Sequence, residues 1–333
     1  MSLPEISARL DATIDLFELY DRDTLSCVVV IKQRFTWDDR GRLARSDGAT
    51  IRAVDEPWPD AESPMFPGDL FVRKPSTDVV VVGHAVSARP TAELDVHVRG
   101  GAMERSLRVF GPRVWYRSLG GMAPTPPQSF ERLPLMWEHA FGGMDVSDPK
   151  RAIDEPRNPY GTGLAIDSAT LEHAPAPRIE DPQDLIQNAR SRPAPAGVAA
   201  LPPHAEPRRR FSGTYDQRWQ DERMPLFPID FDERFNQVAA PGLVAPRPLA
   251  GDEPIQLLNI GRPGPTKLVP PRLVFQVDAR TDRGVVGHRP VLDTVLILAD
   301  ERALEVVHRI AIPLQPPPAL VRELRIYEKR VRR

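Results

Sequence analysis

Proline is the residue that most limits what this chain can fold into. The sequence has 38 prolines in 333 residues, roughly double the ~5% of an average protein. Proline locks the backbone angle φ and has no N–H to donate to a helix or a sheet. We therefore expect short secondary-structure elements joined by long, stiff loops, and no long uninterrupted helix.

The remaining composition is typical of a soluble globular chain, with 41% hydrophobic and 27% charged residues. A net charge of −2 predicts no general attraction to nucleic acid or to an anionic membrane. The first residues show no basic segment followed by an apolar one, so no secretory signal is visible. The longest apolar runs, such as CVVVI and VVVVG, fall far short of the ~20 residues of a membrane span. We expect a cytoplasmic protein with no nucleic-acid or membrane partner.

The clearest periodicities are those of β-strands. Residues 25–37 and 78–86 are rich in valine, and residues 93–99 alternate apolar and polar side chains, as a half-buried strand does. A Gly-Gly turn then leads into 104–111, so 93–111 is predicted to form a hairpin. Four further strands are expected in the second half, at 253–260, 271–280, 292–300 and 303–314.

Helix signals are few. Residues 214–224 fit a short helix stopped by Pro225, and residues 318–333 place Leu320, Leu324, Tyr327 and Val331 at helical spacing. We predict a mainly β protein of packed antiparallel sheets, a sandwich or a distorted barrel, with long Pro-rich loops and few short helices.

The predicted domain organisation is one domain over residues 14–315, followed by a basic C-terminal tail, 316–333, that the spacing allows to be helical. Residues 174–207 contain eight prolines, a composition typical of extended chain. This stretch is compatible with a linker, which would place a subdomain break within 174–210, and equally with an ordered strap laid over the sheets.

The chain lacks the common catalytic and metal-binding motifs. There is no G-x-S-x-G, H-E-x-x-H, C-x-x-C or phosphate-binding P-loop. The only cysteine, Cys27, lies in an apolar run and is expected to be buried and inert, with no disulfide possible within the chain. His84 and His97 could meet across neighbouring strands, but a zinc site needs three or four ligands. We expect no catalytic residue, no metal and no cofactor.

One segment of the chain stands out, LPLMWEHAFGGMD at 133–145, together with NPYGTGLA at 158–165. Trp137 and Phe141 are four residues apart, so on a helical turn they would lie on the same side. Gly142 and Gly143 would then end the turn, because glycine readily adopts the positive φ of a helix C-cap. On this interpretation the two aromatic residues are core anchors beneath a tight corner. As a phosphate cradle the segment lacks a lysine and a strand–loop–helix context.

These motifs resemble a bacterial family, long of unknown function, whose members are adaptors or chaperones for type VI secretion effectors. The family pattern is Trp-Glu-x-Ala-Phe-Gly-Gly, then Asn-Pro-x-Gly-x-Gly after a gap. The matching residues are Trp137, Glu138, Ala140, Phe141, Gly142, Gly143, Asn158, Pro159, Gly161 and Gly163. Further segments resemble the family in the same order, including KPSTDVVVVGHAV, LRVFGPRVW and MPLFPIDFDERFNQVAAP. The resemblance covers roughly residues 25–314.

The resemblance implies a non-enzymatic role. Such adaptors hold a cognate toxin effector in the cytoplasm and load it onto the VgrG spike, often with a PAAR-domain protein at its tip. An exposed sheet edge could accept an effector strand. Two alternatives stay open. One is a hydrolase of carbohydrate or peptidoglycan that uses Glu138, His139 and Asp145, and the other is an immunity-like protein that blocks its toxin.

Overall fold

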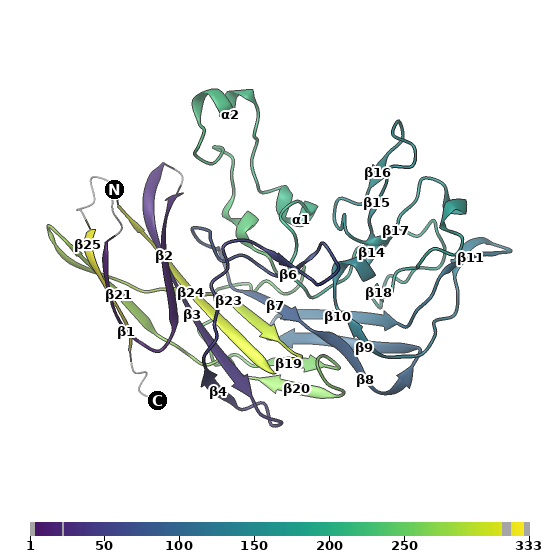
Figure 1. The fold of residues 1–333 in the computed structure, drawn as a ribbon, viewed down its shortest axis with the longest axis horizontal. Coiled ribbons are helices and arrows are strands. Elements are labelled where there is room, and N and C mark those ends of the chain that lie inside the picture. Colours follow the sequence, from purple (N-terminus) through teal and green to yellow (C-terminus); the bar gives the residue numbers. More distant parts are fainter. Residues whose placement is uncertain (1–3, 22, 315–320, 330–333) are drawn as a thin grey trace.

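A computed structural model describes residues 4–21, 23–314 and 321–329 of the chain. It is mainly β, with 45% strand and 7% helix, several antiparallel sheets and few short helices, so the predicted fold class is confirmed. The described strands do not close into a barrel. Figure 1 shows an elongated molecule with the sheets arranged along its length and one helical excursion, around α2, standing off one side.

The largest sheet has six strands and lies in the middle of the molecule (Figure 1). Along it run β2, β3, β24, β23 and β7, with β4 paired to β3. These strands are β2 Thr13–Asp21, β3 Thr24–Trp37, β4 Leu43–Ser46, β7 Asp78–Val82, β23 Val291–Leu298 and β24 Ala303–Pro313. The valine-rich run predicted at 78–86 is broken at Gly83 into two strands, β7 and β8. Cys27 is fully buried in β3, and burial raises the pKa of its thiol to about 11.

A five-stranded sheet contains the predicted hairpin. β9 and β10 pair antiparallel through a turn at residues 101–102, which confirms the hairpin over 93–111. β18 joins one side of the hairpin, and β19 and β20 extend the other. The strands are β9 Glu93–Gly100, β10 Met103–Phe110, β18 Ile179–Glu180, β19 Ile255–Leu258 and β20 Pro265–Leu268.

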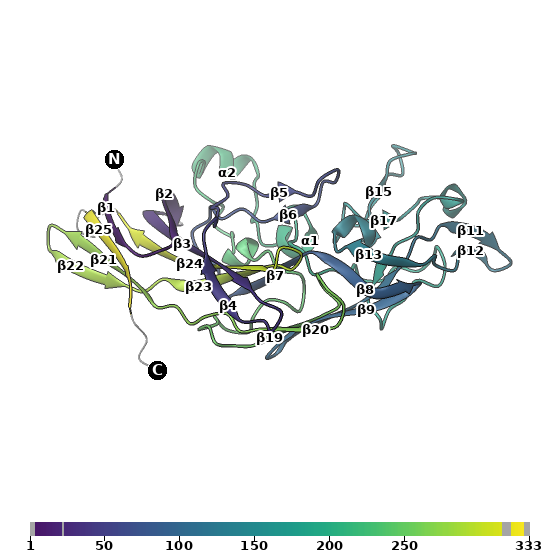
Figure 2. The ribbon, with the colours of Figure 1, turned by 60° about the horizontal axis from the view of Figure 1, so that its bottom comes forward.

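A four-stranded sheet at one end of the molecule joins both ends of the described chain (Figures 1 and 2). Its strands, in order, are β1 Glu5–Arg9, β25 Val321–Glu328, β21 Phe275–Thr281 and β22 Gly284–His288. β25 lies inside this sheet, parallel to β1 and antiparallel to β21.

The helix predicted for the C-terminal tail is therefore wrong over Val321–Glu328. Leu324 and Tyr327 fit the helical spacing, but Leu324 and Ile326 flank the exposed Arg325 in an extended alternation, and both are buried between β21 and β1. As a strand, this segment pairs with β1 on one side and with β21 on the other. A helix in the same place would form neither set of backbone hydrogen bonds. The predicted limits of 14–315 also leave β1 and β25 outside the domain. Residues 316–320 and 330–333 of the predicted tail, and residue 315 of the predicted domain, lie outside the described residues.

The remaining elements are short. The paired strands are β5 Glu56–Pro57 with β6 Pro64–Phe66, β8 His84–Thr91 with β13 Phe130–Pro134, β11 Trp115–Ser118 with β12 Gly121–Pro124, β14 Phe141–Gly142 with β17 Thr162–Gly163, and β15 Met144–Asp145 with β16 Ile153–Asp154. The helices are α1 Glu206–Arg209, α2 Gln217–Glu222 and the 3-10 turns η1 Trp137–His139, η2 Ser168–Leu171 and η3 Glu233–Asn236. None of the helices in the described ranges is long and apolar enough to cross a membrane.

The Pro-rich stretch is an ordered strap. Val198, Ala200 and Leu201 are almost fully buried in the main core. Their backbone is tied to neighbouring segments: the N–H of Val81 on β7 donates to the Val198 carbonyl at 3.1 Å, and the N–H of Leu201 donates to the Val238 carbonyl at 2.7 Å. Of the two possibilities that the composition allowed for 174–207, the structure has the strap.

Candidate binding groove and signature corner

An arm, residues 211–236, stands off the sheets and carries α2 near its tip (Figures 1 and 2). The helix predicted at 214–224 is confirmed as α2, Gln217–Glu222. The carboxylate of Asp216 caps it by accepting a hydrogen bond from the Trp219 N–H at 2.9 Å, which satisfies one of the free N–H groups of the first turn. Pro225 follows the helix and cannot extend it.

The two ends of the arm lie next to each other. The Thr214 N–H donates to Asp230 Oδ1 at 2.9 Å, and the Thr214 hydroxyl donates to Asp230 Oδ2 at 2.8 Å. The Asp232 N–H donates to the Phe211 carbonyl at 3.0 Å. The two hydrogen bonds from Thr214 lower the pKa of Asp230, and the bond from the Thr214 backbone N–H contributes most. The arm is therefore a closed loop that leaves the body and returns at one place.

Three phenylalanines on the returning half of the arm form an aromatic ladder. The rings of Phe227 and Phe231 stack at 4.3 Å between centroids, and Phe231 meets Phe235 edge-on at 5.9 Å. Offset and edge-to-face ring pairs stabilise a packing beyond the area that they bury. The ladder gives the arm a rigid apolar wall, although little of the arm belongs to the core.

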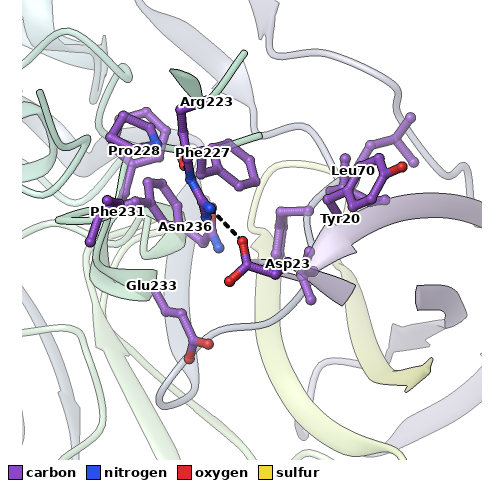
Figure 3. Close-up of a pocket in the computed structure, with 14 residues that line it drawn as sticks. Tyr20, Asp23, Leu70, Arg223, Phe227, Pro228, Phe231, Glu233 and Asn236 are labelled. Atoms are coloured by element: carbon purple, nitrogen blue, oxygen red, sulfur yellow. Dashed lines mark hydrogen bonds and ion pairs between the residues drawn. The ribbon is translucent and has the colours of Figure 1, made fainter. Parts of the chain in front are cut away.

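Between this wall and the body lies a groove of about 570 Å³ (Figure 3). Its other sides are formed by the end of β2, with Leu19 and Tyr20, and by residues 70–72. Most of the lining residues are apolar. The charged groups are Asp23, Arg223 and Glu233, and an ion pair from Arg223 to Asp23 links the arm to the turn after β2 (Figure 3). The volume is in the range of ~300–1,000 Å³ typical of ligand pockets.

The body side of the groove is held in place by buried charges. The guanidinium of Arg309 on β24 donates to the carbonyls of Asp69 and Phe71 at 2.6 and 3.1 Å and lies 3.7 Å from the centroid of the Phe71 ring. Lys32 on β3 pairs with the carboxylate of Asp69 at 2.9 Å. Because these groups are buried and paired, the 69–72 segment is a fixed wall of the groove.

A second hollow of about 470 Å³ lies on the other side of Ile229. It shares Arg223, Pro228 and Ile229 with the groove, and its remaining lining comes from residues 214–222 and Asp230. We call it the side hollow. Ile229, on the ridge between the two, has 84% of its surface exposed, and Met224 and Tyr215 on the same arm are also exposed. Such a gathering of exposed apolar residues around hollows is typical of interaction sites.

The predicted signature residues come together in one corner at the other end of the molecule (Figure 1). Trp137 and Glu138 are on η1, Phe141 and Gly142 form β14, and Gly163 is on β17, with Ala140 and Gly143 flanking β14 and Asn158, Pro159 and Gly161 in the connection before β17. The amide nitrogen of Asn158 donates to the carbonyls of Trp137 and Phe141 at 2.9 and 3.1 Å. Ala140 is fully buried and its carbonyl accepts from the Thr162 N–H at 3.0 Å.

The predicted helical turn from Trp137 to Gly143 is wrong. η1 ends at His139, Ala140 is already extended with φ of −90° and ψ of 164°, and Phe141 begins a strand that pairs with β17. Trp137 therefore packs in the main core, while Phe141 packs in a separate cluster with Trp115 and Leu171. Gly142 and Gly143 are not a helix cap. They lie in and after β14, where the Asn158 segment approaches too closely for a side chain.

Two signature residues fasten other segments to the corner. The indole N–H of Trp137 donates to the Ala200 carbonyl of the strap at 2.8 Å. The carboxylate of Glu138 accepts from the backbone N–H groups of Glu62 and Ser63 at 3.0 and 2.7 Å, and from the Ser63 hydroxyl at 2.6 Å. All of these contacts are within the protein, and they join four segments that are far apart in the sequence.

The structure does not bring the residues of the hydrolase alternative into a shared pocket. Glu138 is bonded to residues 62–63, and Asp145 accepts from the N–H groups of Ile166 and Ser147. Burial, assisted by the positive charge of Arg178, lowers the pKa of His139 to about 4. None of the three lines the groove or the side hollow.

The two histidines considered for a metal have other partners. Nδ1 of His84 lies 2.6 Å from Asp300 Oδ2, and Nδ1 of His97 lies 2.8 Å from the Ser106 hydroxyl. Over residues 4–21, 23–314 and 321–329, no group of three or more His, Cys, Asp or Glu side chains is placed to hold a metal ion.

Sequence reasoning did not find the groove. Its walls come from Leu19, Tyr20 and Asp23, from residues 70–72 and from the stretch 223–236, which lie far apart in the chain. One signal was present, the spacing of Phe227, Phe231 and Phe235 at intervals of four. Pro228 lies within this run and is unfavourable in a helix, so the spacing by itself does not predict that the three rings form one wall.

Comparison with known proteins identifies the family. The model of a family described as an uncharacterized protein conserved in bacteria, DUF2169, matches residues 22–309. Comparisons with curated proteins and with solved structures gave no match. The matched region includes the arm, the strap and every signature residue, and it covers most of the 333 residues. The chain therefore belongs to the bacterial DUF2169 family.

Proposed function

We propose that the protein is a non-enzymatic adaptor that binds a toxin effector in the cytoplasm and loads it onto a type VI secretion spike of VgrG and PAAR proteins. The groove beside the arm is the observation that carries the binding role. It combines an apolar lining with a ridge residue, Ile229, that is 84% exposed. The ordered motifs resembling effector adaptors, from residue 25 to 314, supply the secretion context.

The physical form of the groove suits protein binding. Its walls are braced by the aromatic ladder on one side and by the buried charges of Arg309 and Lys32 on the other. A braced surface loses little conformational entropy when a partner docks, so more of the contact energy contributes to affinity. Aromatic side chains in desolvated pockets commonly dominate the binding energy of an interface.

Deleting the gene from its host tests the role. We expect export of one effector to be lost while secretion of the needle tube continues. Complementation with the wild-type gene should restore export, and an Ile229→Asp gene should not, because a carboxylate on the ridge opposes burial against a partner. Leu119→Asp, a change at a fully exposed leucine in the β11–β12 turn, is the matched control and should restore export. Normal export of every effector from the deletion strain would refute the adaptor role.

The immunity-like alternative also uses a toxin-binding surface, and co-expression separates it from the adaptor. An adaptor should raise the amount of intact toxin that is recovered and exported without protecting the cell from toxin activity. Rescue of cell growth with no effect on export would favour an immunity protein.

A further inference from the structure

The groove and the side hollow together are acidic. Their described lining has five carboxylates, Asp23, Asp216, Glu222, Asp230 and Glu233, and two guanidinium groups, Arg218 and Arg223; Glu233 is also paired with Arg73 at 3.6 Å, which leaves a formal excess of two negative charges. Both arginines are already paired, Arg218 with Glu222 at 2.9 Å and Arg223 with Asp23.

Two of the carboxylates, Asp216 and Asp230, form no ion pair among the described residues, although Arg218 lies near enough to Asp216 to interact with it electrostatically. Asp216 accepts the Trp219 N–H at the start of α2, and Asp230 accepts the N–H and hydroxyl of Thr214. Both line the side hollow. Their negative charges are thus held in place by neutral donors and remain free to attract a cation.

The apolar groove and the acidic side hollow adjoin at Ile229, which lines both. The groove is walled by Phe227, Phe231 and Leu70, and the side hollow holds Asp216 and Asp230. A chain that lies across Ile229 would contact the apolar pocket and the pair of carboxylates together.

We propose that this surface binds a segment of the effector in which large apolar residues lie next to Lys or Arg. The apolar side chains enter the groove, and the cationic side chain lies against Asp216 and Asp230. The inference rests on the proposed adaptor function and adds the chemistry of the segment that is recognised. Charge complementarity of this kind chiefly sets specificity and the rate of association.

Two fluorescein-labelled peptides test the chemistry without knowledge of the effector. One contains Leu and Lys, and the other is the same peptide with Glu in place of Lys. We expect the Leu/Lys peptide to bind the full-length protein in fluorescence anisotropy, with an affinity that falls as NaCl is raised, and the Leu/Glu peptide to bind at least ~10-fold more weakly. Equal binding of both peptides, or no binding of either, would overturn the inference.

Substitutions in the groove and the side hollow test whether the peptide binds at this surface. Asp216→Asn with Asp230→Asn removes both charges but keeps side-chain oxygens for the Trp219 and Thr214 N–H groups, and Asn is as good a helix cap as Asp. We expect this double variant to bind the Leu/Lys peptide several-fold more weakly and with less dependence on salt, and Ile229→Asp to lose the apolar contribution. Asp167→Asn, at the corresponding cap of η2, is the matched control and should bind as the wild type does.

The effector itself separates failure of this inference from failure of the adaptor role. Overlapping peptides covering the protein that co-purifies from the native host should bind only where an apolar run lies next to Lys or Arg, and the Asn double variant should lose them. If export depends on the adaptor but the bound peptides are acidic, or bind the double variant normally, the adaptor role stands and this inference falls. A wild-type dimer that Ile229→Asp dissociates in light scattering would assign the surface to a second copy of the chain and would equally overturn it.

Discussion

At the scale of single residues, the signature corner depends on backbone segments that approach more closely than side chains permit. A Cβ on Gly142 would overlap the Asn158 carbonyl oxygen, and a Cβ on Gly143 would lie 2.5 Å from the Gly161 carbonyl oxygen. Gly143 also has a φ of 96°, a conformation that other residues rarely adopt. The Asn158 amide can bridge two carbonyls only because the glycines, which have no side chain, let its segment approach this closely.

Gly143→Ala should therefore destabilise the protein. The strained backbone alone costs of the order of 1–3 kcal/mol, and the contact with Gly161 adds to it. Chemical denaturation followed by circular dichroism measures the change. Gly120→Ala, where a Cβ would meet nothing within 4 Å, is the control and should stay within about 0.5 kcal/mol of wild type. Equal stability of the two variants would show that the corner tolerates a side chain.

His139, in the same corner, makes stability depend on pH. Burial lowers its pKa from 6.5 to about 4, so the unfolded chain takes up a proton below pH 6.5 that the folded protein does not. Stability should fall as the pH drops from about 6.5 to about 4 and then level off, with a total loss of about 3 kcal/mol from this residue. In His139→Gln that part of the fall should be missing. An unchanged pH dependence in the variant would contradict the prediction.

At the scale of elements, the arm is separable from the fold. Its ends meet through the bonds of Thr214 and Asp230, α2 buries no residue, and Pro228 alone is buried between residues 215 and 229. The strap, which is equally poor in regular structure, is the opposite case because its residues lie in the main core. A segment with little regular secondary structure is thus peripheral in the case of the arm and buried in the case of the strap.

Replacing residues 215–229 by a short Gly-Asn-Gly linker should leave the free energy of unfolding within about 1 kcal/mol of wild type, since little apolar surface is lost. Binding of the effector should be lost, because the linker removes Phe227, Ile229 and Asp216 from the proposed surface. Denaturation and co-purification measure the two effects. A shortened protein that still binds its effector would place the interface elsewhere.

At the scale of the whole molecule, the two ends of the described chain meet in one sheet. β25 lies between β1 and β21, and its Leu324 and Ile326 are almost fully buried. Residues 321–328 of the segment that composition marks as a basic tail are therefore a strand of the fold, and Arg322 and Arg325 are its outward-facing residues.

Truncation after residue 315 should destabilise the protein by at least about 4 kcal/mol, because two large buried side chains lose their environment and β1 loses its partner. Thermal and chemical unfolding test this. Should the truncated chain fail to fold, Ile326→Val gives a graded measure, with an expected loss of about 0.5–1.5 kcal/mol. Arg322→Gln, on the exposed side of β25, should be neutral. A truncated protein as stable as the full chain would make β25 dispensable.

The sequence by itself was sufficient to predict the β-strands in which apolar and polar residues alternate or in which apolar residues follow one another. The hairpin at 93–111 and the long strands in the second half follow from local pattern, as does the short helix before Pro225. The corner was misjudged because the four-residue spacing of Trp137 and Phe141 suits a helical turn. What ends the turn is Asn158, whose side chain binds carbonyls on both sides of Ala140 from 17 and 21 residues away.

What the sequence determined is local: prolines that rule out long helices, period-two alternation that makes strands, and glycines where backbone must approach backbone. The tertiary structure decided what depends on partners distant in the chain. Leu324 fits a helical spacing with Tyr327 and an extended alternation with Ile326, and pairing with β1 and β21 selects the strand. The groove likewise exists only where β2, residues 70–72 and the arm meet. The local sequence pattern sets which conformation a segment prefers. A site, in contrast, consists of surfaces that come together only in the folded chain.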